Sequence, residues 1–396
     1  MPKYNRAERF AYRTLIVFYN YGRLLSVFSW KLQKHTRKME LQQAKCTNRL
    51  LRIIWRTLLT LIFLTLMPKM MAPFLRLSAK GFLLFFANIQ VVTVTLFSVI
   101  SFVIHERSDR KIFHIINQLV TMYERISAKS GVQQLLGRTF VVSVIAKFLL
   151  SILGLVYEIP LLLGDKEIVK SLSGIYLWLG TIYTLDCCFL GFLVIRQMYV
   201  AMATHLEYML EEMSAIESEE PRKRLSKYQR IKLLCMYSES IDDSNNIYSI
   251  LYELTKQFQH IFRWQVLYYI YYNFVIILML MHRFIWRYFE SNFVDIMSFF
   301  SSVFKFCNLA FLILSTNGVV EKSQLPDLLN LDLVCSDIDA RWDESVETFI
   351  CQRKVENLEI KVMGFFHLNN EFILVIISAI MSYLFILIQF GLTKQQ

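Results

Sequence analysis

The chain has 396 residues, of which 55% are hydrophobic and only 19% are charged. A soluble domain carries about 25% charged residues, and its apolar residues come in short, interrupted runs. Here residues 81–104 and 372–393 contain no charged side chain, although about 18 apolar residues are enough to cross a bilayer as a helix. This composition excludes a disordered chain, a nucleic-acid-binding domain and a disulfide-stapled secreted domain. It predicts an all-α membrane protein with several spans.

Seven apolar segments are long enough to cross a membrane as helices. They cover residues 51–72, 81–104, 139–163, 174–200, 264–285, 296–318 and 367–391. Upstream, residues 12–30 are charged and short, which predicts an amphipathic helix in the inner membrane interface; an eighth span is the alternative. Residues 105–127 are predicted to continue the second span as a cytoplasmic amphipathic helix, and residues 337–363 predict a further helix that ends at Gly364.

The basic residues outside the spans predict the orientation of the chain. Residues 1–56 hold thirteen Lys and Arg against Glu8 and Glu40, so the net charge of +11 is concentrated before the first span. With the N-terminus in the cytoplasm, the inner segments hold 32 basic residues and the outer segments hold about eight. Seven spans then place the C-terminus outside the cell, the reverse of a G-protein-coupled receptor.

Two blocks of opposite charge lie in the inner segment 202–263. Six Glu residues fall between Glu207 and Glu220, and six basic residues follow between Arg222 and Lys232. The blocks either pair as an antiparallel helical hairpin or form two separate solvated faces, and we favour the second interpretation.

Signatures of enzymes and of metal sites are lacking in the sequence. His105 and Glu106 begin like a zinc-protease motif, but Asp109 stands where the second His ligand is required. The sequence has no G-x-S-x-G nucleophile elbow and no Gly-rich phosphate loop. We therefore expect no catalytic activity, no metal and no cofactor.

A narrow polar stripe runs along the last apolar segment. At 100° per residue, Ser378, Ser382, Phe385 and Gln389 fall within about 60° of one another. Lipid cannot satisfy such a stripe, so it faces protein or water. It is either a packing seam between helices or the wall of an ion path, with Phe385 or Ile386 as a hydrophobic constriction.

Charged side chains within other spans mark a second region of interest. Lys147, Glu158 and Asp186 are costly in hydrocarbon and are expected to face the interior of the helix bundle. They either form structural ion pairs or line a binding cavity. Tyrosines crowd the outer halves of the same spans, which suits a largely apolar pocket with a few polar anchors, although ordinary packing explains many of them.

The C-terminal stretch carries a recognisable motif. Residues 364–369 read GFFHLN and residues 380–390 read IMSYLFILIQF. This stretch resembles the signature of insect gustatory receptors, in which a Thr-Tyr pair, five mostly aliphatic residues and a Gln-Phe pair close the seventh helix. Ser382 replaces the usual Thr and keeps its hydroxyl, while the spacing of Tyr383 to the Gln-Phe pair is intact.

The resemblance implies a ligand-gated, non-selective cation channel in the plasma membrane of gustatory sensory neurons. It further implies a homo- or hetero-tetramer of gustatory receptor subunits around the seventh helices, opened by a small-molecule tastant, with bitter compounds as the favoured class. The polar stripe agrees with this and favours the pore interpretation. The pore-lining residues it implies are Ser378, Ser382, Phe385, Ile386 and Gln389, and the helix-bracing residues are Tyr383 and Phe390.

The resemblance also implies a ligand pocket between the outer halves of the second to sixth spans. Its candidate residues are Asn88, Tyr157, Glu158, Tyr176, Tyr183, Asp186, Tyr272 and Asn273. The chain then divides into an N-terminal cytoplasmic segment, six spans with the pocket, a cytoplasmic anchor helix, and the pore helix with a short outer tail. These parts cover residues 1–50, 51–318, 319–366 and 367–396.

Two alternatives from other functional classes remain. One is a receptor that signals through a cytoplasmic partner docked on residues 202–263. The other is a small-molecule transporter that uses Lys147 and Asp186 as coupling groups.

Overall fold

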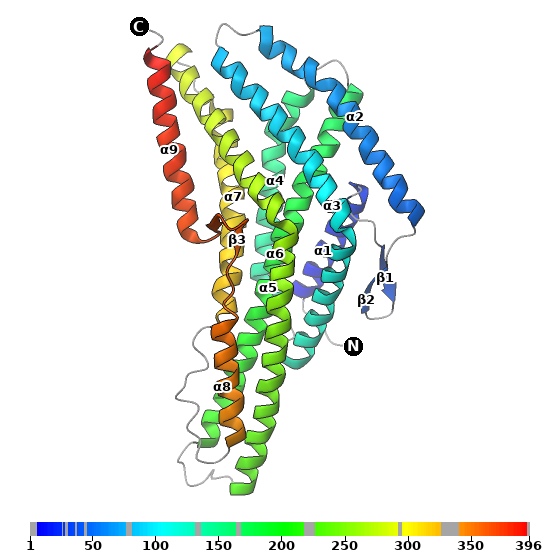
Figure 1. Ribbon diagram of the computed structural model, residues 1–396, viewed down its shortest axis with the longest axis vertical. Coiled ribbons are helices and arrows are strands. Elements are labelled where there is room, and N and C mark those ends of the chain that lie inside the picture. The colour runs from blue at the N-terminus through cyan, green and yellow to red at the C-terminus, as the bar shows by residue number, and fades with distance from the viewer. Residues whose placement is uncertain are drawn as a thin grey trace.

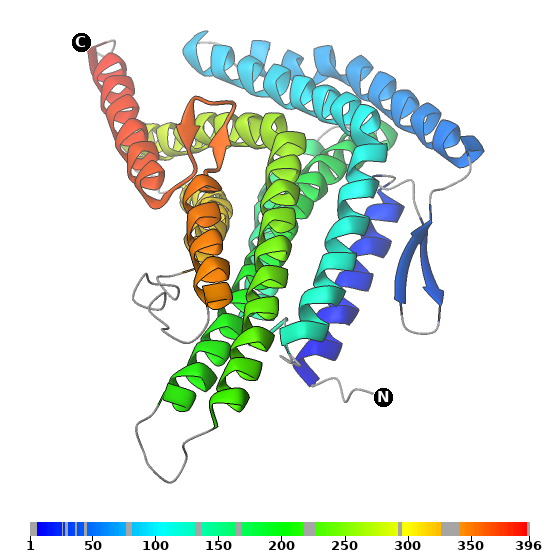
Figure 2. The ribbon, with the colours of Figure 1, turned by 60° about the horizontal axis from the view of Figure 1, so that its bottom comes forward.

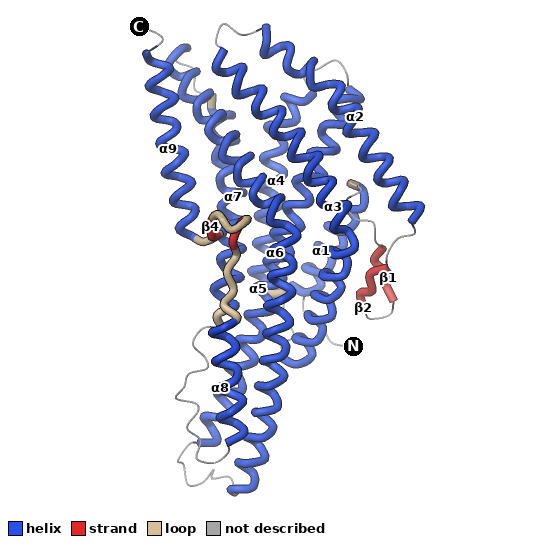
Figure 3. Tube along the Cα trace, viewed as in Figure 1, coloured by secondary structure: helices blue, strands red, loops and turns tan. Residues whose placement is uncertain are grey.

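The computed structural model is an elongated bundle of long helices with two small β-hairpins (Figure 1). It describes residues 6–25, 27, 31–35, 38–42, 46–76, 81–130, 136–163, 168–217, 226–291, 295–325 and 340–393. The helices are α1 (Arg6–Leu24), α2 (Cys46–Arg76), α3 (Gly81–Ser130), α4 (Arg138–Leu163), α5 (Ile168–Glu217), α6 (Lys227–Ser291), α7 (Ile296–Ser323), α8 (Ala340–Val355) and α9 (Asn370–Thr393). The antiparallel pairs are β1 (Lys31–His35) with β2 (Lys38–Gln42), and β3 (Lys361–Val362) with β4 (Phe366–His367) (Figure 3).

Each predicted span falls within a single helix, namely α2, α3, α4, α5, α6, α7 or α9; only residues 367–369 of the last predicted span precede its helix. Among the described residues, the segments Leu179–Glu212, Ile231–Phe289 and Ile296–Ser323 are long and apolar enough to cross a membrane, and Asn370–Ile386 is a shorter apolar helix.

Several helices continue far beyond the length that a membrane requires. A span needs about 20 residues, whereas α3 has 50 residues and α6 has 65. The predicted extension of the second span over residues 105–127 is therefore confirmed. In Figure 1 the lower half of the molecule consists mainly of these extensions, together with α8.

The extensions of α5 and α6 form an antiparallel hairpin (Figure 2). The hydroxyl of Tyr237 on α6 donates a hydrogen bond of 2.8 Å to Glu212 Oε2 on α5. The helical hairpin is therefore formed, but this contact joins Glu212 to a tyrosine outside the basic block, and Glu207, Glu211 and Lys232 are exposed. Residues 218–225, which hold the ends of both charge blocks, lie outside the described residues.

The N-terminal helix α1 covers residues 12–24 of the predicted amphipathic stretch 12–30 and packs against α4 and α5. The ring of Phe18 stacks on Tyr183 of α5 with 4.5 Å between ring centroids. Gly22 is required at this crossing, because a Cβ atom there would lie 2.3 Å from the Tyr183 hydroxyl. The β1–β2 hairpin that follows was not predicted.

The predicted helix over residues 337–363 is confirmed only in part, because α8 ends at Val355. Beyond it, Leu358, Ile360 and Val362 are buried while the residues between them are exposed, which is the pattern of an extended chain. Met363 and Gly364 both have positive φ angles, 54° and 78°, and form the tight turn between β3 and β4. The chain then enters α9 directly.

Candidate functional site

A small cavity with polar and apolar walls lies among α3, α4, α5, α6 and α7, in the part of the bundle assigned to the membrane. Its volume is about 30 Å³, enough for one or two water molecules. It is lined by Phe97, Lys147, Leu150, Ser151, Gly154, Thr181, Ile182, Leu185, Asp186, Tyr269, Tyr272, Asn273, Phe304, Lys305 and Asn308.

A buried ion pair forms one side of this cavity. Lys147 Nζ on α4 lies 3.4 Å from Asp186 Oδ1 on α5, and the two side chains are only 4% and 8% exposed. The hydroxyl of Ser151 donates a hydrogen bond of 3.3 Å to the same carboxylate oxygen, and Lys147 also donates to the side-chain oxygen of Asn308 on α7. Lys147 and Asp186 thus form the structural ion pair that one of the two alternatives predicts, and both also line this cavity.

Aromatic rings and an amide complete the cavity wall. Lys147 Nζ lies 5.8 Å from the centre of the Tyr269 ring, and Lys305 Nζ lies 5.5 Å from that of Tyr272. These distances allow cation–π attraction. Asn273 donates to the carbonyl oxygen of Tyr269 at 2.8 Å, while its own Oδ1 has no hydrogen-bond partner among the described residues. The cavity therefore offers cations, an anion, an amide oxygen and ring faces to a small polar molecule.

The structure separates the candidate pocket residues into three groups. Asp186, Tyr272 and Asn273 line the cavity. Tyr176 and Tyr183 instead donate hydrogen bonds to backbone carbonyl oxygens of Leu24 and Phe18, at 3.1 and 2.9 Å, and so hold the N-terminal segment. The remaining candidates, Asn88, Tyr157 and Glu158, have side chains outside the described part of the structure.

The α7 wall of the cavity was not predicted from the sequence. Ser298, Ser301, Lys305 and Asn308 recur at helical spacing in an otherwise apolar span. The first three are buried, and Lys305 and Asn308 line the cavity. This periodic polar set is the signal that would have found them.

The last helix, α9, has one buried face and one exposed face within the single chain. Ile376, Ile380 and Leu384 are buried at a spacing of four residues, and α9 contacts α6 and α7. At 100° per residue, the centre of the polar stripe lies about 170° around the helix from these three residues.

The stripe is exposed along its described length. Ser378, Ser382, Phe385, Ile386 and Gln389 are all exposed in the single chain. The hydroxyl of Ser382 donates to the carbonyl oxygen of Ser378 at 2.9 Å, so it is satisfied within its own helix.

Of the two predicted helix-bracing residues, Tyr383 and Phe390, the structure describes the side chain of Tyr383. Its ring packs edge to face against Phe274 of α6, with 5.9 Å between ring centroids. The side chain of Phe390 lies outside the described part.

Comparison with known proteins assigns the family. A family model described as "7tm Chemosensory receptor" matches residues 15–394. The chain belongs to this chemosensory receptor family. Gustatory receptor for bitter taste 93a of Drosophila melanogaster is 39% identical over 394 residues, which cover 98% of this chain and 94% of the relative. The resemblance to gustatory receptors is thus confirmed, and the chain belongs to a family of receptors rather than of enzymes.

Solved structures confirm the fold of this chemosensory receptor. The insect olfactory receptor OR5 from Machilis hrabei superposes with a TM-score of 0.64, covering 96% of this chain and 99% of that chain at 13% identity. The same olfactory receptor in complex with eugenol gives a TM-score of 0.59, with 94% and 97% covered at 12% identity. The all-α, seven-span architecture predicted from the sequence is confirmed.

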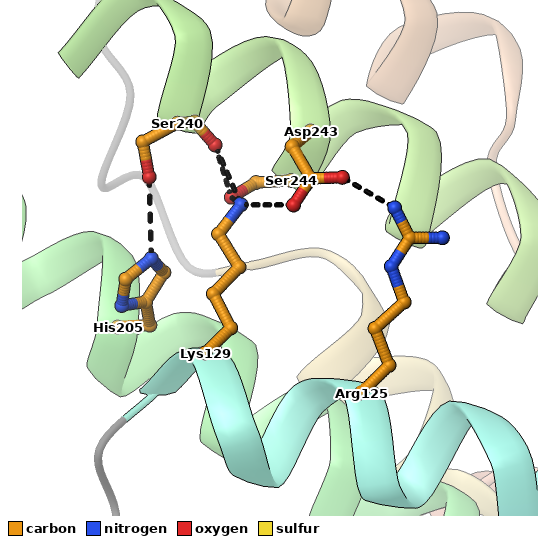
Figure 4. A network of polar contacts seen from close by, with 6 residues as sticks. All are labelled: Arg125, Lys129, His205, Ser240, Asp243 and Ser244. Atoms are coloured by element: carbon orange, nitrogen blue, oxygen red, sulfur yellow. Dashed lines mark hydrogen bonds and ion pairs between the residues drawn. The ribbon is translucent and has the colours of Figure 1, made fainter. Parts of the chain in front are cut away.

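A second polar cluster ties the receptor's α3 to its α6 outside the predicted spans. Figure 4 shows its members, which are Arg125, Lys129, His205, Ser240, Asp243 and Ser244. Lys129 Nζ lies 2.8 Å from Asp243 Oδ2 and also donates to the carbonyl oxygen of Ser240 at 2.9 Å, while Arg125 Nη2 lies 2.5 Å from Asp243 Oδ1. The cluster fixes the end of α3 on the α5–α6 hairpin.

The Lys129 contact predicts a pH dependence. The hydrogen bond from Lys129 holds the pKa of Asp243 below its ordinary value, so the stabilisation is present above about pH 3.9 and is lost as the pH falls through the lowered folded-state pKa. Lys129→Ala should cost less than about 1 kcal/mol, because Asp243 is 39% exposed and solvent screens the pair. Thermal unfolding of purified receptor should show a higher midpoint for the wild type than for Lys129→Ala at pH 7, and this difference should shrink towards pH 3. A difference that persists at pH 3 would contradict a stabilising contact between Lys129 and ionised Asp243.

Proposed function

We propose that the receptor is a subunit of a ligand-gated, non-selective cation channel that small tastants open in the plasma membrane of gustatory sensory neurons. The exposed polar face of α9, opposite the face that packs on α6 and α7, supports this proposal most directly. Four copies of the chain, or of related subunits, would bring these faces together around a pore. Because the Drosophila relative is named for bitter taste, we propose bitter compounds as the ligand class.

The cavity around the Lys147–Asp186 pair is the proposed ligand site. Its volume of about 30 Å³ is too small for a tastant, so a ligand must separate the surrounding helices in order to enter. Two of these helices, α6 and α7, also carry α9. A ligand that fits the expanded arrangement better would shift the population towards it, and α9 would move with its supporting helices.

A substitution on the polar stripe tests the pore assignment. Gln389→Ala should change ion selectivity or rectification of tastant-evoked currents, because the amide would no longer replace part of the hydration of a passing ion. Whole-cell recordings in cells expressing the receptor, with its partner subunits if it needs them, would measure reversal potentials in Na⁺, K⁺ and Ca²⁺ solutions.

Ile377→Ala is the matched control for the pore substitution. Ile377 is also exposed on α9, but at 100° per residue it lies about 110° from the stripe. Unchanged permeation in a conducting Gln389→Ala channel would remove Gln389 from the pore wall.

Currents that vanish in excised patches without GTP would favour signalling through a cytoplasmic partner, and ligand flux without current would favour a transporter.

A further inference from the structure

A larger and more polar pocket lies between α6 and the segment that joins α8 to α9. Its volume is about 360 Å³, and its mouth is open to solvent. It is lined by Tyr252, Lys256, Gln259, His260, Arg263, Asn357, Glu359, Lys361, Met363 and Gly364.

The first wall of this pocket is a single face of α6. Lys256, Gln259, His260 and Arg263 stand at positions i, i+3, i+4 and i+7, which places them side by side on a helix. The predicted span of α6 starts at residue 264, so this face lies at the cytoplasmic surface of the membrane. The Nε atom of Arg263 is buried and has no hydrogen-bond partner among the described residues.

The second wall is the β3–β4 hairpin and the chain before it. Gln259 Nε2 donates a hydrogen bond of 2.8 Å to the carbonyl oxygen of Lys361, which attaches this wall to α6. Lys361 Nζ lies 2.5 Å from Glu359 Oε2. With Lys256 and Arg263 opposite, the lining holds three cations and one anion, so its net charge is positive.

We propose that this pocket binds a phosphate-bearing anion at the cytoplasmic membrane surface, the chemistry shared by a phosphoinositide headgroup and a soluble inositol phosphate. Phosphate groups match converging Lys and Arg side chains, whose N–H groups donate charge-assisted hydrogen bonds to phosphate oxygens. Basic residues beside a span commonly only set topology, but here they converge on a pocket large enough for a headgroup. Basic pockets between helices at the cytoplasmic surface are typical of lipid headgroup recognition.

An occupant of this pocket would contact the segment that leads into α9. Leu368 N–H donates to the carbonyl oxygen of Ile360 at 3.0 Å, and the rings of Phe366 and Phe372 stack with 4.4 Å between centroids. The side chain of Asn369 caps α9 by accepting from the Phe372 N–H at 3.1 Å. The hairpin and the start of α9 are thus one connected unit, and an anion that bridges Arg263 and Lys361 holds this unit against α6.

Binding to the purified full-length receptor tests the proposal without tastant or current, so its result is independent of the channel proposal. The probes are short-chain phosphatidylinositol 4,5-bisphosphate, inositol 1,4,5-trisphosphate and short-chain phosphatidylcholine, each titrated by microscale thermophoresis. We expect both phosphate-bearing probes to bind, and the double variant Lys256→Ala/Arg263→Ala to weaken them at least about 10-fold through the loss of two charge-assisted contacts. Comparable binding of both probes supports recognition of the phosphates alone, whereas binding of the lipid alone identifies a membrane source.

Lys232→Ala provides the matched control, because Lys232 is an exposed lysine on α6 that does not line the pocket. A second double variant, Lys256→Arg/Arg263→Lys, preserves the charge and should retain most of the binding. Thermal unfolding of each variant confirms that it is folded before titration. The proposal is overturned if neither phosphate-bearing probe binds more tightly than phosphatidylcholine. It is equally overturned if the double alanine variant binds as well as Lys232→Ala.

Discussion

Asp186→Ala is expected to lower the free energy of unfolding of the receptor by about 3–5 kcal/mol, because it leaves a buried lysine without its counter-charge. Lys147 is only 4% exposed, so bulk solvent does not reach its ammonium group, and the adjoining cavity has room for no more than one or two water molecules. The contacts that remain, with the Asn308 side chain and with the rings of Tyr269 and Phe189, carry no negative charge and cannot neutralise it. The change should appear as a lower midpoint of thermal unfolding for detergent-purified receptor and as reduced delivery to the cell surface.

The double variant Lys147→Met/Asp186→Leu separates lost pairing from lost packing. Replacing both partners by apolar side chains of similar volume removes the uncompensated charge and is often neutral for stability. We therefore expect the double variant to recover most of the stability that Asp186→Ala loses. Equal stability of the double variant and Asp186→Ala would show that the unpaired charge of Lys147 does not cause the loss of stability. Recovered stability without a tastant response would support the role of the pair in the ligand site.

The hydropathy of the sequence was sufficient to locate the membrane part of the fold. Long apolar runs identify spans because a bilayer imposes a minimum helix length. The amphipathic spacing of residues 105–127 likewise predicted the extension of α3. The polar stripe of α9 was also readable, because helical periodicity alone places Ser382 and Gln389 on one face.

Contacts between side chains on different helices could not be predicted from the same patterns. Tyr183 was assigned to the pocket, but its hydroxyl donates to Phe18 of α1. A tyrosine that contacts a ligand and one that contacts a neighbouring helix have the same local sequence, so spacing along α5 cannot separate them. The pairing of Lys147 with Asp186 could not be predicted for the same reason, since it depends on how α4 and α5 are rotated against each other.

One missed element did carry a signal in the sequence. Residues 357–362 read NLEIKV, in which polar and apolar residues alternate strictly. A period of two predicts an extended strand rather than the last turns of a helix. This alternation follows directly on the amphipathic α8, and it encodes one wall of the basic pocket.

Trp342→Ala is expected to destabilise the cytoplasmic part of the receptor by about 3–5 kcal/mol, the usual cost of deleting a large buried aromatic side chain. Trp342 is 1% exposed, and Val346 and Phe349 are fully buried beside it on α8. The helix is also attached by polar contacts, including a 2.6 Å hydrogen bond between the hydroxyls of Ser238 and Ser345. Thermal unfolding and limited proteolysis of purified receptor would measure the loss.

Arg341→Ala is the matched control, because it lies next to Trp342 but is 53% exposed and reaches Glu239 only at 3.7 Å. Its cost should stay below about 1 kcal/mol. If Trp342→Ala were as stable as Arg341→Ala, the packing of α8 on α6 would contribute little. If instead proteolysis cut Trp342→Ala within α8 while the membrane helices stayed protected, α8 would be a unit that unfolds on its own. Because α8 and α9 are joined through the hairpin on α6, that outcome predicts weaker binding of inositol 1,4,5-trisphosphate to Trp342→Ala.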